Sequence, residues 1–485
     1  MALEEIRRER LEKLERLKEA GMEPYPARTG RTHSNQQFLD NHSALEANSE
    51  EVIMAGRVMS IREHGGSLFA DIFDGTAKVQ AYFKKESLGE AFETFTALVD
   101  TGDIIEAGGV AFTTQRGMPS LLGNSWRMLA KSLVPVPDQW FGIKDEDERY
   151  RKRYLDILLS DELAQRIRRR SQFWNTIRRF LLEREFVEVE TPVLETTTGG
   201  AEARPFITHH NALDMDVYLR ISAGELWQKR LMVAGLPKVF EIGRIFRNEG
   251  MSAEHAQDYT QVEFYEAFKD YRAGMDMIVE LYRTIAETVY GSQIFSIKGV
   301  DVDLSQDWAT YDFCALMQEA YGFDPRENIK AEELENLLKE EDIPVPEVAE
   351  TGRMVDLLWK KIRKGIVGPG FLVNVPVYLE PLAKKSEEDP RVVERFQVMM
   401  AGSEIGKGFS ELNDPLDQAE RFMEQQKLRE AGDEEAQMPD ADFVEALEYG
   451  MPPAFGFGIS ERLFSFFENV SIREGQIFPL MRPRA

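Results

Sequence analysis

Residues 246–268 (FRNEGMSAEHAQDYTQVEFYEAF) place an arginine, several acids, a histidine and tyrosines at the facing ends of two apolar runs. An arginine fork binds carboxylate or phosphate oxygens through paired hydrogen bonds, and acids balance a desolvated ammonium group. If the two runs pair as a hairpin, Arg247 and Glu263 face one cleft. The alternative is a surface hairpin with a cross-strand salt bridge, which contributes little to stability. The residues alone favour neither interpretation.

The second apolar run alternates in the manner of a half-buried strand, in which residues two apart share a face. The residues predicted to point into a core are Thr260, Val262, Phe264 and Phe268. The residues predicted on the opposite face are Gln261, Glu263, Tyr265 and Ala267. An apolar row backed by an acid and a phenol is typical of a sheet that lines a polar pocket.

Two glycine-rich segments do not fit the nucleotide-binding motifs that they resemble. GSEIGKG (402–408) has three residues between its first glycines instead of four, and Gly408 stands where the phosphate loop has Ser or Thr. GFGIS (456–460) lacks the third glycine and the βαβ context of a dinucleotide fingerprint. Neither segment is predicted to bind phosphates in that way.

The composition is that of a multidomain globular protein of 485 residues. A net charge of -26 argues against indiscriminate nucleic-acid binding, and we expect no DNA partner. The basic run at 166–180 could dock a specific RNA, although a solvated helix face is an equal alternative. The single cysteine excludes an intrachain disulfide and a cysteine-built zinc site. No window approaches a membrane span and the charged N-terminus has no signal-peptide core, so we expect no membrane partner and a cytoplasmic protein.

The periodicities predict two folded parts that must position these residues. Residues 3–20 have the spacing of an amphipathic helix, and a helical interruption is predicted near 86–98. Strand-like runs with period two lie at 52–61, 67–74, 77–83, 103–113 and 127–137. Five such strands suit an OB-fold β-barrel, although other small barrels fit as well.

Hairpin-joined strands with helices between them predict an α+β domain with a mainly antiparallel sheet after the barrel. The predicted boundaries are a helix and lead-in at 1–48, the barrel at 49–137, a linker at 138–150, a catalytic domain at 151–485 and a helical insert at about 310–364.

The pattern FRNEG…H…E.Y resembles motif 2 of class II aminoacyl-tRNA synthetases, and in particular the bacterial-type lysyl-tRNA synthetases of subclass IIb. The resemblance runs almost the whole chain, through RERLEKLERLKEAGMEPYP, RYRKRYLDILL, EVETPVLETTTGGAEARPFITHHNALDMDVYLRIS, PLAKKSEEDP, GFSELNDP and SIREGQIFPLMRP. It implies a class II antiparallel sheet flanked by helices, preceded by an OB-fold anticodon module. It also implies a homodimer built around motif 1 near Pro192.

The activity implied by the resemblance is that of a lysine--tRNA ligase. ATP and L-lysine would give lysyl-adenylate and pyrophosphate, and the lysyl group would then pass to the 3′ end of tRNA(Lys), with Mg²⁺ accompanying ATP. The catalytic residues implied are Arg247, Arg462 and Glu249. The ATP-binding residues implied are Arg247, Glu249, His255, Tyr259, Glu404 and Arg462. The lysine-binding residues implied are Gly200, Glu225, Arg247, Glu263, Tyr265, Lys407 and Glu411. The anticodon readers implied are Arg62, Phe69 and Gln80.

The chain departs from the family pattern at three places. Gln397 stands where the family has the first of two Mg²⁺-binding glutamates, so Glu404 is the implied metal ligand and Gln397 is a doubtful one. Lys407 replaces an asparagine, and its ammonium could offset the lost metal charge. The glycines of motif 3 (FGFGISERL) are offset by one.

The alternatives are a relative acting on asparagine or aspartate, a ligase that aminoacylates elongation factor P, and a non-catalytic RNA-binding or regulatory paralogue. The acids favour lysine, and the barrel, which such protein-modifying ligases lack, argues against the second alternative. Retention of Arg247, Glu249, Glu404 and Arg462 argues against the third.

Overall fold

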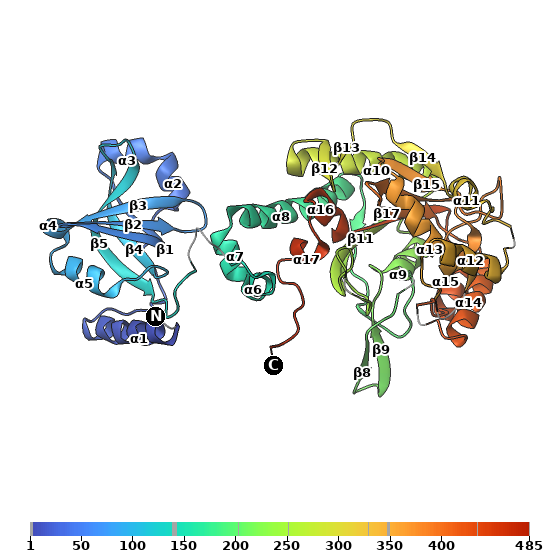
Figure 1. The fold of residues 1–485 in the computed structure, drawn as a ribbon, viewed down its shortest axis with the longest axis horizontal. Coiled ribbons are helices and arrows are strands. Elements are labelled where there is room, and N and C mark those ends of the chain that lie inside the picture. The colour runs from blue at the N-terminus through green and yellow to red at the C-terminus, as the bar shows by residue number, and fades with distance from the viewer. Residues whose placement is uncertain are drawn as a thin grey trace. The chain divides into compact units, whose positions relative to one another are not determined.

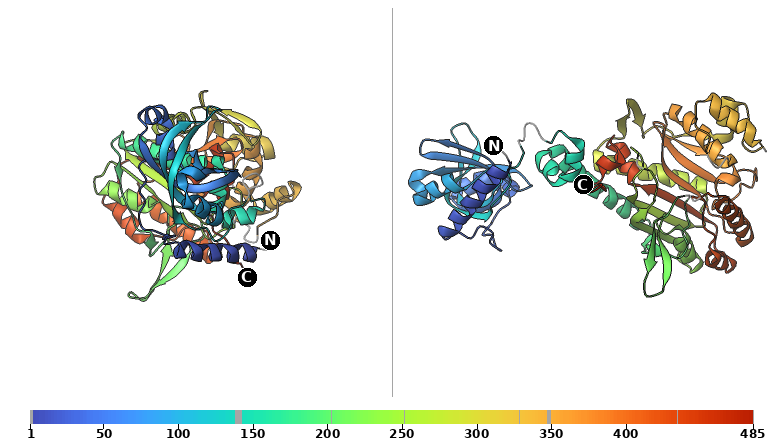
Figure 2. Two further views of the ribbon diagram at one scale, coloured as in Figure 1. Left: turned by 90° about the vertical axis from the view of Figure 1, so that its left-hand side faces the viewer. Right: turned by 60° about the horizontal axis from the view of Figure 1, so that its bottom comes forward.

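The structure is a computed structural model that describes residues 3–137, 143–201, 203–250, 252–327, 329–346, 350–433 and 435–484. The chain forms two compact units, residues 1–159 and 160–485 (Figures 1 and 2). Of the predicted linker at 138–150, residues 138–142 lie outside the described part, and its end belongs to helix α6 (Glu146–Arg151), which α7 (Arg153–Leu159) follows. The predicted domain boundaries stay a prediction.

The first unit is built on a closed five-stranded barrel with strand order β1-β2-β3-β5-β4. Its strands are β1 (Glu51–His64), β2 (Ser67–Phe73), β3 (Lys78–Lys84), β4 (Ile104–Thr113) and β5 (Pro119–Ala130). Besides α6 and α7, its helices are α1 (Leu3–Glu19), α2 (Asn35–Asp40), α3 (His42–Asn48), α4 (Lys85–Leu88) and α5 (Glu90–Leu98). Alternate residues of β2 and β3 are buried, as the period of two predicts.

The prediction for the last barrel strand was wrong in its position. The strand was predicted at 127–137, whereas β5 begins at Pro119 and ends at Ala130. The pairing of β4 with β5 shifts register at Gly123, Asn124 and Ser125, which lie before the predicted start of the strand. A Cβ atom at Gly109 would lie 2.1 Å from the Leu122 carbonyl oxygen, so this irregular pairing depends on glycine.

The second unit contains an eight-stranded, mainly antiparallel sheet in the order β14-β15-β16-β17-β18-β11-β10-β6, with parallel pairs only at its two ends. The strands are β6 (Val187–Glu188), β10 (Lys238–Phe246), β11 (Asp258–Ala267), β14 (Ala309–Asp312), β15 (Gly370–Val373), β16 (Arg395–Met400), β17 (Ser403–Ser410) and β18 (Ala454–Ser460). The predicted α+β class with an N-terminal barrel is confirmed. The segments rejected as nucleotide motifs form β17 and β18, which pair antiparallel.

Helices of the second unit lie around this sheet (Figure 1). They are α8 (Asp161–Leu182), α9 (Glu225–Val233), α10 (Tyr271–Ile285), α14 (Pro415–Glu430), α15 (Ala441–Glu448), α16 (Glu461–Phe467) and α17 (Ile472–Gly475). The predicted helical insert contains α11 (Phe313–Tyr321), α12 (Ala331–Glu340) and α13 (Thr351–Ile362). Smaller sheets pair β12 (Ile294–Ile297) with β13 (Val300–Asp303), and β9 (Met215–Leu219) with β7 (Leu194–Glu195) and β8 (Ile207–His210).

The basic run at 166–180 lies on α8, and several of its arginines pair with acids of this unit. Arg169 pairs with Glu468, and Arg170 pairs with the buried Glu461 at 2.5 Å. These ion pairs use guanidinium groups that an RNA-docking face would need.

Strand β11 has the two faces that the alternation predicts, except at its end. Val262 and Phe264 are buried in the core, whereas Glu263 and Tyr265 face the opposite side. The prediction for Phe268 was wrong, because its side chain is exposed. This residue follows the strand and has φ of 62°, a left-handed conformation that ends the alternation.

Candidate active site

One cavity of about 480 Å³ in the second unit brings together every residue predicted for lysine, ATP or metal binding. It is lined by Gly200, Glu225, Arg247, Glu249, His255, Tyr259, Glu263, Tyr265, Gln397, Glu404, Lys407, Glu411 and Arg462. The structure thus favours the pocket over the surface-hairpin alternative. The role of each residue stays a prediction.

Buried carboxylates form one end of the cavity. Glu263 on β11 accepts hydrogen bonds from the backbone N–H of Ala223, at 2.9 Å, and from the Tyr265 hydroxyl, at 3.1 Å. Burial, and then the charge of Glu225, raise the pKa of Glu263 to about 7. The acid is therefore held in place, and the charge of Arg247 opposes the rise of its pKa without outweighing burial.

Glu411 follows β17 and is the second deeply buried acid, with 1% of its surface exposed. Burial raises the pKa of Glu411 to about 8, although the ion pair with Lys229 opposes the shift. A Cβ atom at Gly456 would lie 2.0 Å from Oε1 of Glu411 and 2.5 Å from the Tyr265 ring. Glycine at this position of β18 therefore makes room for both side chains.

Glu225, the first residue of α9, is also buried and lies beside the backbone of Gly200. Gly200 has φ of 87°, and a Cβ atom there would lie 2.6 Å from Oγ of Ser222 and 2.8 Å from Cβ of Glu225. Only a bare backbone fits so close to the acid. An ammonium group placed between Gly200 and Glu225 would contact a carboxylate and backbone groups.

Arginines occupy the other end of the cavity. Arg247 donates from Nε to the Ile221 carbonyl oxygen at 3.2 Å, and its guanidinium lies 5.9 Å from the centre of the Tyr259 ring. Arg462, at the start of α16, forms an ion pair with Glu254. Each arginine retains donors for a phosphate or carboxylate group.

Glu254 carries a firmly ionised carboxylate in this arginine-rich part. Lys298 Nζ lies 2.9 Å from its Oε1, in addition to the pair with Arg462. Burial alone would raise the pKa of Glu254, but Arg462 and Lys298 outweigh burial and lower it to about 2. The carboxylate of Glu254 is thus ion-paired with the guanidinium group of Arg462.

Glu249 and His255 lie between these groups. Burial raises the pKa of Glu249, and Arg247 opposes the shift. Burial lowers the pKa of His255, and the charge of Arg462 adds to this effect. His255 Nδ1 lies 2.7 Å from Oγ of Ser252, which fixes the ring. The imidazole is consequently favoured in its neutral form beside the arginines.

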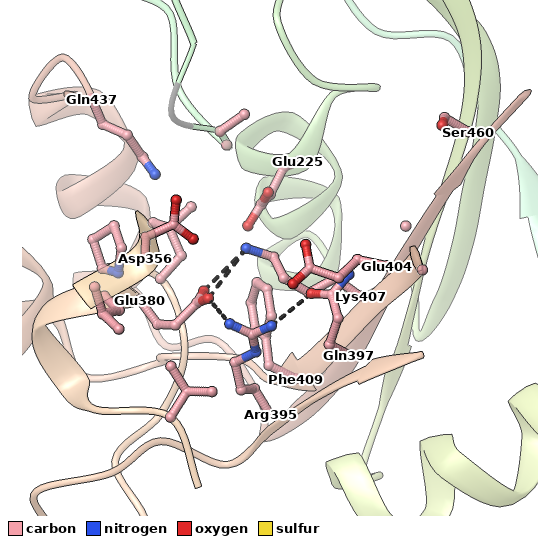
Figure 3. Close-up of a pocket in the computed structure, with 18 of the residues that line it drawn as sticks. Glu225, Asp356, Glu380, Arg395, Gln397, Glu404, Lys407, Phe409, Gln437 and Ser460 are labelled. Carbon is pink, nitrogen blue, oxygen red and sulfur yellow. Dashed lines mark hydrogen bonds and ion pairs between the residues drawn. The ribbon is translucent and has the colours of Figure 1, made fainter. Parts of the chain in front are cut away.

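A mixed-charge cluster lies on the cavity wall at β16 and β17 (Figure 3). Lys407 Nζ is 3.1 Å from Oε2 of the buried Glu380, which also pairs with Arg395. Arg395 donates from Nη2 to Oε1 of Gln397 at 2.6 Å. Burial would raise the pKa of Glu380, but Arg395 and Lys407 outweigh it and lower the pKa. The amide of Gln397 is thereby turned toward an arginine.

The residues of this wall can contribute one carboxylate to a Mg²⁺ ion carried by ATP. Glu404 lines the cavity, and its Oε1 accepts a hydrogen bond from Trp359 Nε1 at 2.7 Å. No group of three or more His, Cys, Asp or Glu side chains is placed for a metal within the described ranges. Mg²⁺ is commonly held by one or two carboxylates together with substrate phosphates, so this wall fits an ion that arrives with ATP.

The predicted anticodon readers lie on the barrel. Phe69 on β2 stacks on Tyr82 of β3, with ring centres 4.6 Å apart and planes 10° apart. Arg62 pairs with Phe69 across strands β1 and β2. Gln80 lies two residues before Tyr82 on β3, so the two side chains share a face of the strand. Aromatic stacks with polar neighbours suit unpaired bases.

Several residues of the site were missed by the sequence reasoning. They are Lys229, Glu254, Glu380, Arg395, Gly456 and, on the barrel, Tyr82. A signal existed only for Tyr82 and Lys229, through the strand period and the i,i+4 helix spacing after Glu225. The others come together only through tertiary pairing.

Comparison with known proteins agrees with this geometry. Residues 145–482 match the family described as tRNA synthetases class II (D, K and N), and residues 52–129 match an OB-fold nucleic acid binding domain. The chain belongs to the class II tRNA synthetases of this D, K and N group.

Within this class, lysine--tRNA ligases are among the similar proteins. The ligase of Fervidobacterium nodosum is 43% identical over 99% of this chain and 95% of its own length. That of Roseiflexus castenholzii is 43% identical over the whole of both chains, and that of Thermotoga maritima is 41% identical over 99% and 97%.

Proposed function

We propose that this protein is a lysine--tRNA ligase, which activates L-lysine with ATP and transfers the lysyl group to the 3′ end of tRNA(Lys). Full-length similarity to lysine--tRNA ligases supports the proposal. The observation that carries it is the cavity with buried acids at one end and arginines at the other. Glu263, Glu411 and Glu225 would balance the two ammonium groups of lysine, and an aspartate substrate would need cations there instead.

The residues would perform activation by alignment and charge neutralisation. The lysine carboxylate attacks the α-phosphorus of ATP, a P–O bond forms, and the bond to pyrophosphate breaks. Arg247 would bind both the carboxylate and the α-phosphate, which holds the reacting atoms together. Arg462, once released by Glu254, would bind the γ-phosphate. Tyr259 would stack on adenine, with Glu249 and His255 in the ATP-binding loop.

Mg²⁺ would neutralise the phosphates of the bound nucleotide, with Glu404 as its protein ligand. Lys407 and Gln397 replace the neutral amide and the acid expected on this wall. The ammonium of Lys407 would then contribute the positive charge that a second carboxylate-bound metal otherwise supplies. Because Glu380 holds Lys407 at 3.1 Å, the charge has a fixed position.

The assembly we propose is a homodimer in the cytoplasm, where tRNA is charged. Apolar residues near Pro192 support the dimer, because they are exposed on α8, β6, β7 and β8, and just before β7, in a single chain. They are Leu182, Val187, Val193, Leu194 and Ile207. No described helix is long and apolar enough to cross a membrane.

Amino-acid-dependent exchange of pyrophosphate into ATP tests the proposal. The expected result is exchange with L-lysine and not with L-aspartate or L-asparagine. Lysylation of tRNA(Lys) should follow, whereas an anticodon-substituted transcript should be a poor acceptor. Exchange driven by asparagine or aspartate alone would show that the substrate has been misassigned.

A further inference from the structure

Lys229 is a buried ammonium that stands directly behind the acid end of the cavity. It lies on α9, one turn after Glu225, and has 1% of its surface exposed. Its Nζ is 2.8 Å from Oε1 of Glu225 and 2.5 Å from Oε2 of Glu411. The residues that line the cavity include both acids but not Lys229. It therefore contacts the two acids from the side opposite to a substrate.

The surroundings of Lys229 keep it charged and fixed. Burial lowers the pKa of Lys229, but the two carboxylates outweigh burial and raise it. The rings of Phe409 and Tyr265 lie 5.4 and 5.9 Å from its Nζ, close enough for cation–π attraction. A buried ammonium held from two elements ties α9 to the end of β17.

The number of charges in the pocket depends on this lysine. Glu225, Glu263 and Glu411 are the buried carboxylates of this end, and Lys229 cancels one of their charges. When all three carboxylates are ionised, two negative charges then remain, which equals the two ammonium groups of a lysine substrate. Without Lys229 a third charge would be uncompensated, and one acid would take up a proton instead.

We infer that Lys229 is a positioning and specificity-determining residue, an internal counter-ion that sets the pocket to accept two ammonium groups and orients Glu225 and Glu411 toward them. The inference rests on the proposed function, because it concerns the lysine end of the same cavity. Lys229 does not touch the substrate and acts through the two acids. Its effect should consequently appear in the handling of lysine and not in that of ATP.

Lys229→Met, which keeps an unbranched side chain one atom shorter and removes the charge, tests the inference in the full-length protein by lysine-dependent pyrophosphate exchange. The expected result is a rise of about tenfold or more in KM for lysine, with KM for ATP changed less than about threefold, as for loss of a charged contact. The acid limb of kcat/KM for lysine should move to higher pH, because the acids lose a cation. Lys238→Met, which removes another ion-paired lysine, from β10, is the control and should change neither value.

Repeating the Lys229→Met substitution in a Glu411→Gln background gives a double-mutant cycle. Lys229→Met should raise KM for lysine much less in that background, since the charge to be balanced is already gone. An equal factor in both backgrounds, an unmoved pH profile, or parallel losses for ATP and lysine would overturn the inference.

Folding provides a separate outcome of the same cycle. If Lys229→Met fails to fold and the double variant folds, the ion-pair role is supported, because the unpaired Glu411 is then the cause. Failure of both variants to fold would reduce Lys229 to a general structural residue and overturn the inference. Absence of lysine-dependent exchange in the native protein would instead refute the proposed function itself, and this inference with it.

Discussion

Replacement of Glu263 by glutamine should weaken lysine activation and at the same time stabilise the fold. The carboxylate is 4% exposed, and burial with the charge of Glu225 raises its pKa to about 7. Glutamine keeps the shape and can still accept the hydrogen bond from Ala223. It removes the charge that the ammonium of lysine would need, and its NH2 group replaces the oxygen that accepts from the Tyr265 hydroxyl.

The two magnitudes follow from this burial. Loss of a hydrogen bond between charged groups costs about 1.5–3 kcal/mol, which corresponds to a rise of roughly 10- to 150-fold in KM for lysine. The native pKa of Glu263 lies above its unfolded value, so the folded state binds the proton more tightly. Stability is therefore lost as pH rises from about 4.5 to about 7, and glutamine should recover on the order of 1–3 kcal/mol above that range.

Pyrophosphate exchange and thermal unfolding measure the two effects. The matched control is Glu266→Gln on the same strand, where Glu266 pairs with Lys238 at 3.4 Å away from the cavity. Glu263→Gln should raise the melting temperature more at pH about 7.5 than at pH about 5, because linkage acts in this window. In the native protein, kcat/KM for lysine should rise with pH up to about 8, as Glu263 and Glu411 ionise. An unchanged KM for lysine, or a variant less stable than the control at pH about 7.5, would refute the reasoning.

Three further changes test the rest of the site. Lys407→Asn should lower the rate of pyrophosphate exchange by about tenfold and increase its dependence on Mg²⁺, since a positive charge next to the phosphates is lost. An unchanged rate and Mg²⁺ dependence would rule out that Lys407 compensates for a missing metal charge. Glu254→Gln should lower KM for ATP by up to about fivefold, because Arg462 no longer needs to be released from an ion pair, and a raised KM would contradict this. Phe69→Ala should raise KM for tRNA(Lys) by about tenfold or more and leave pyrophosphate exchange unchanged; equal losses in both assays would exclude a role in base stacking.

The periodicity of the sequence predicted features that depend on a local repeat, such as which side chains share a face of a strand. The period of two along β11 placed Glu263 and Tyr265 on the cavity side and Val262 in the core. It failed where the backbone departs from regular geometry, at the left-handed Phe268 and at the register shift around Asn124 in the middle of β5. The α+β class followed from the order of the elements and not from exact boundaries.

The partners of the site residues could not be predicted in the same way. Arg462 and Glu254 are more than 200 residues apart and meet only because β18 lies next to β11. Gly456 has no local signal for its role, since the space it provides is filled by Glu411, just after β17, and by Tyr265 from β11. Such contacts depend on the strand order of the completed sheet.

The hydrogen bond between Trp359 and Glu404 connects the helical insert directly to the part of the cavity where we propose that ATP binds. Trp359 lies on α13, and Arg363, just after that helix, is 3.8 Å from the same carboxylate. Shortening the insert to a turn would remove the donor that orients Glu404, and the carboxylate would be free to rotate away from an incoming cation. A minimised version of this enzyme would therefore need to keep α13.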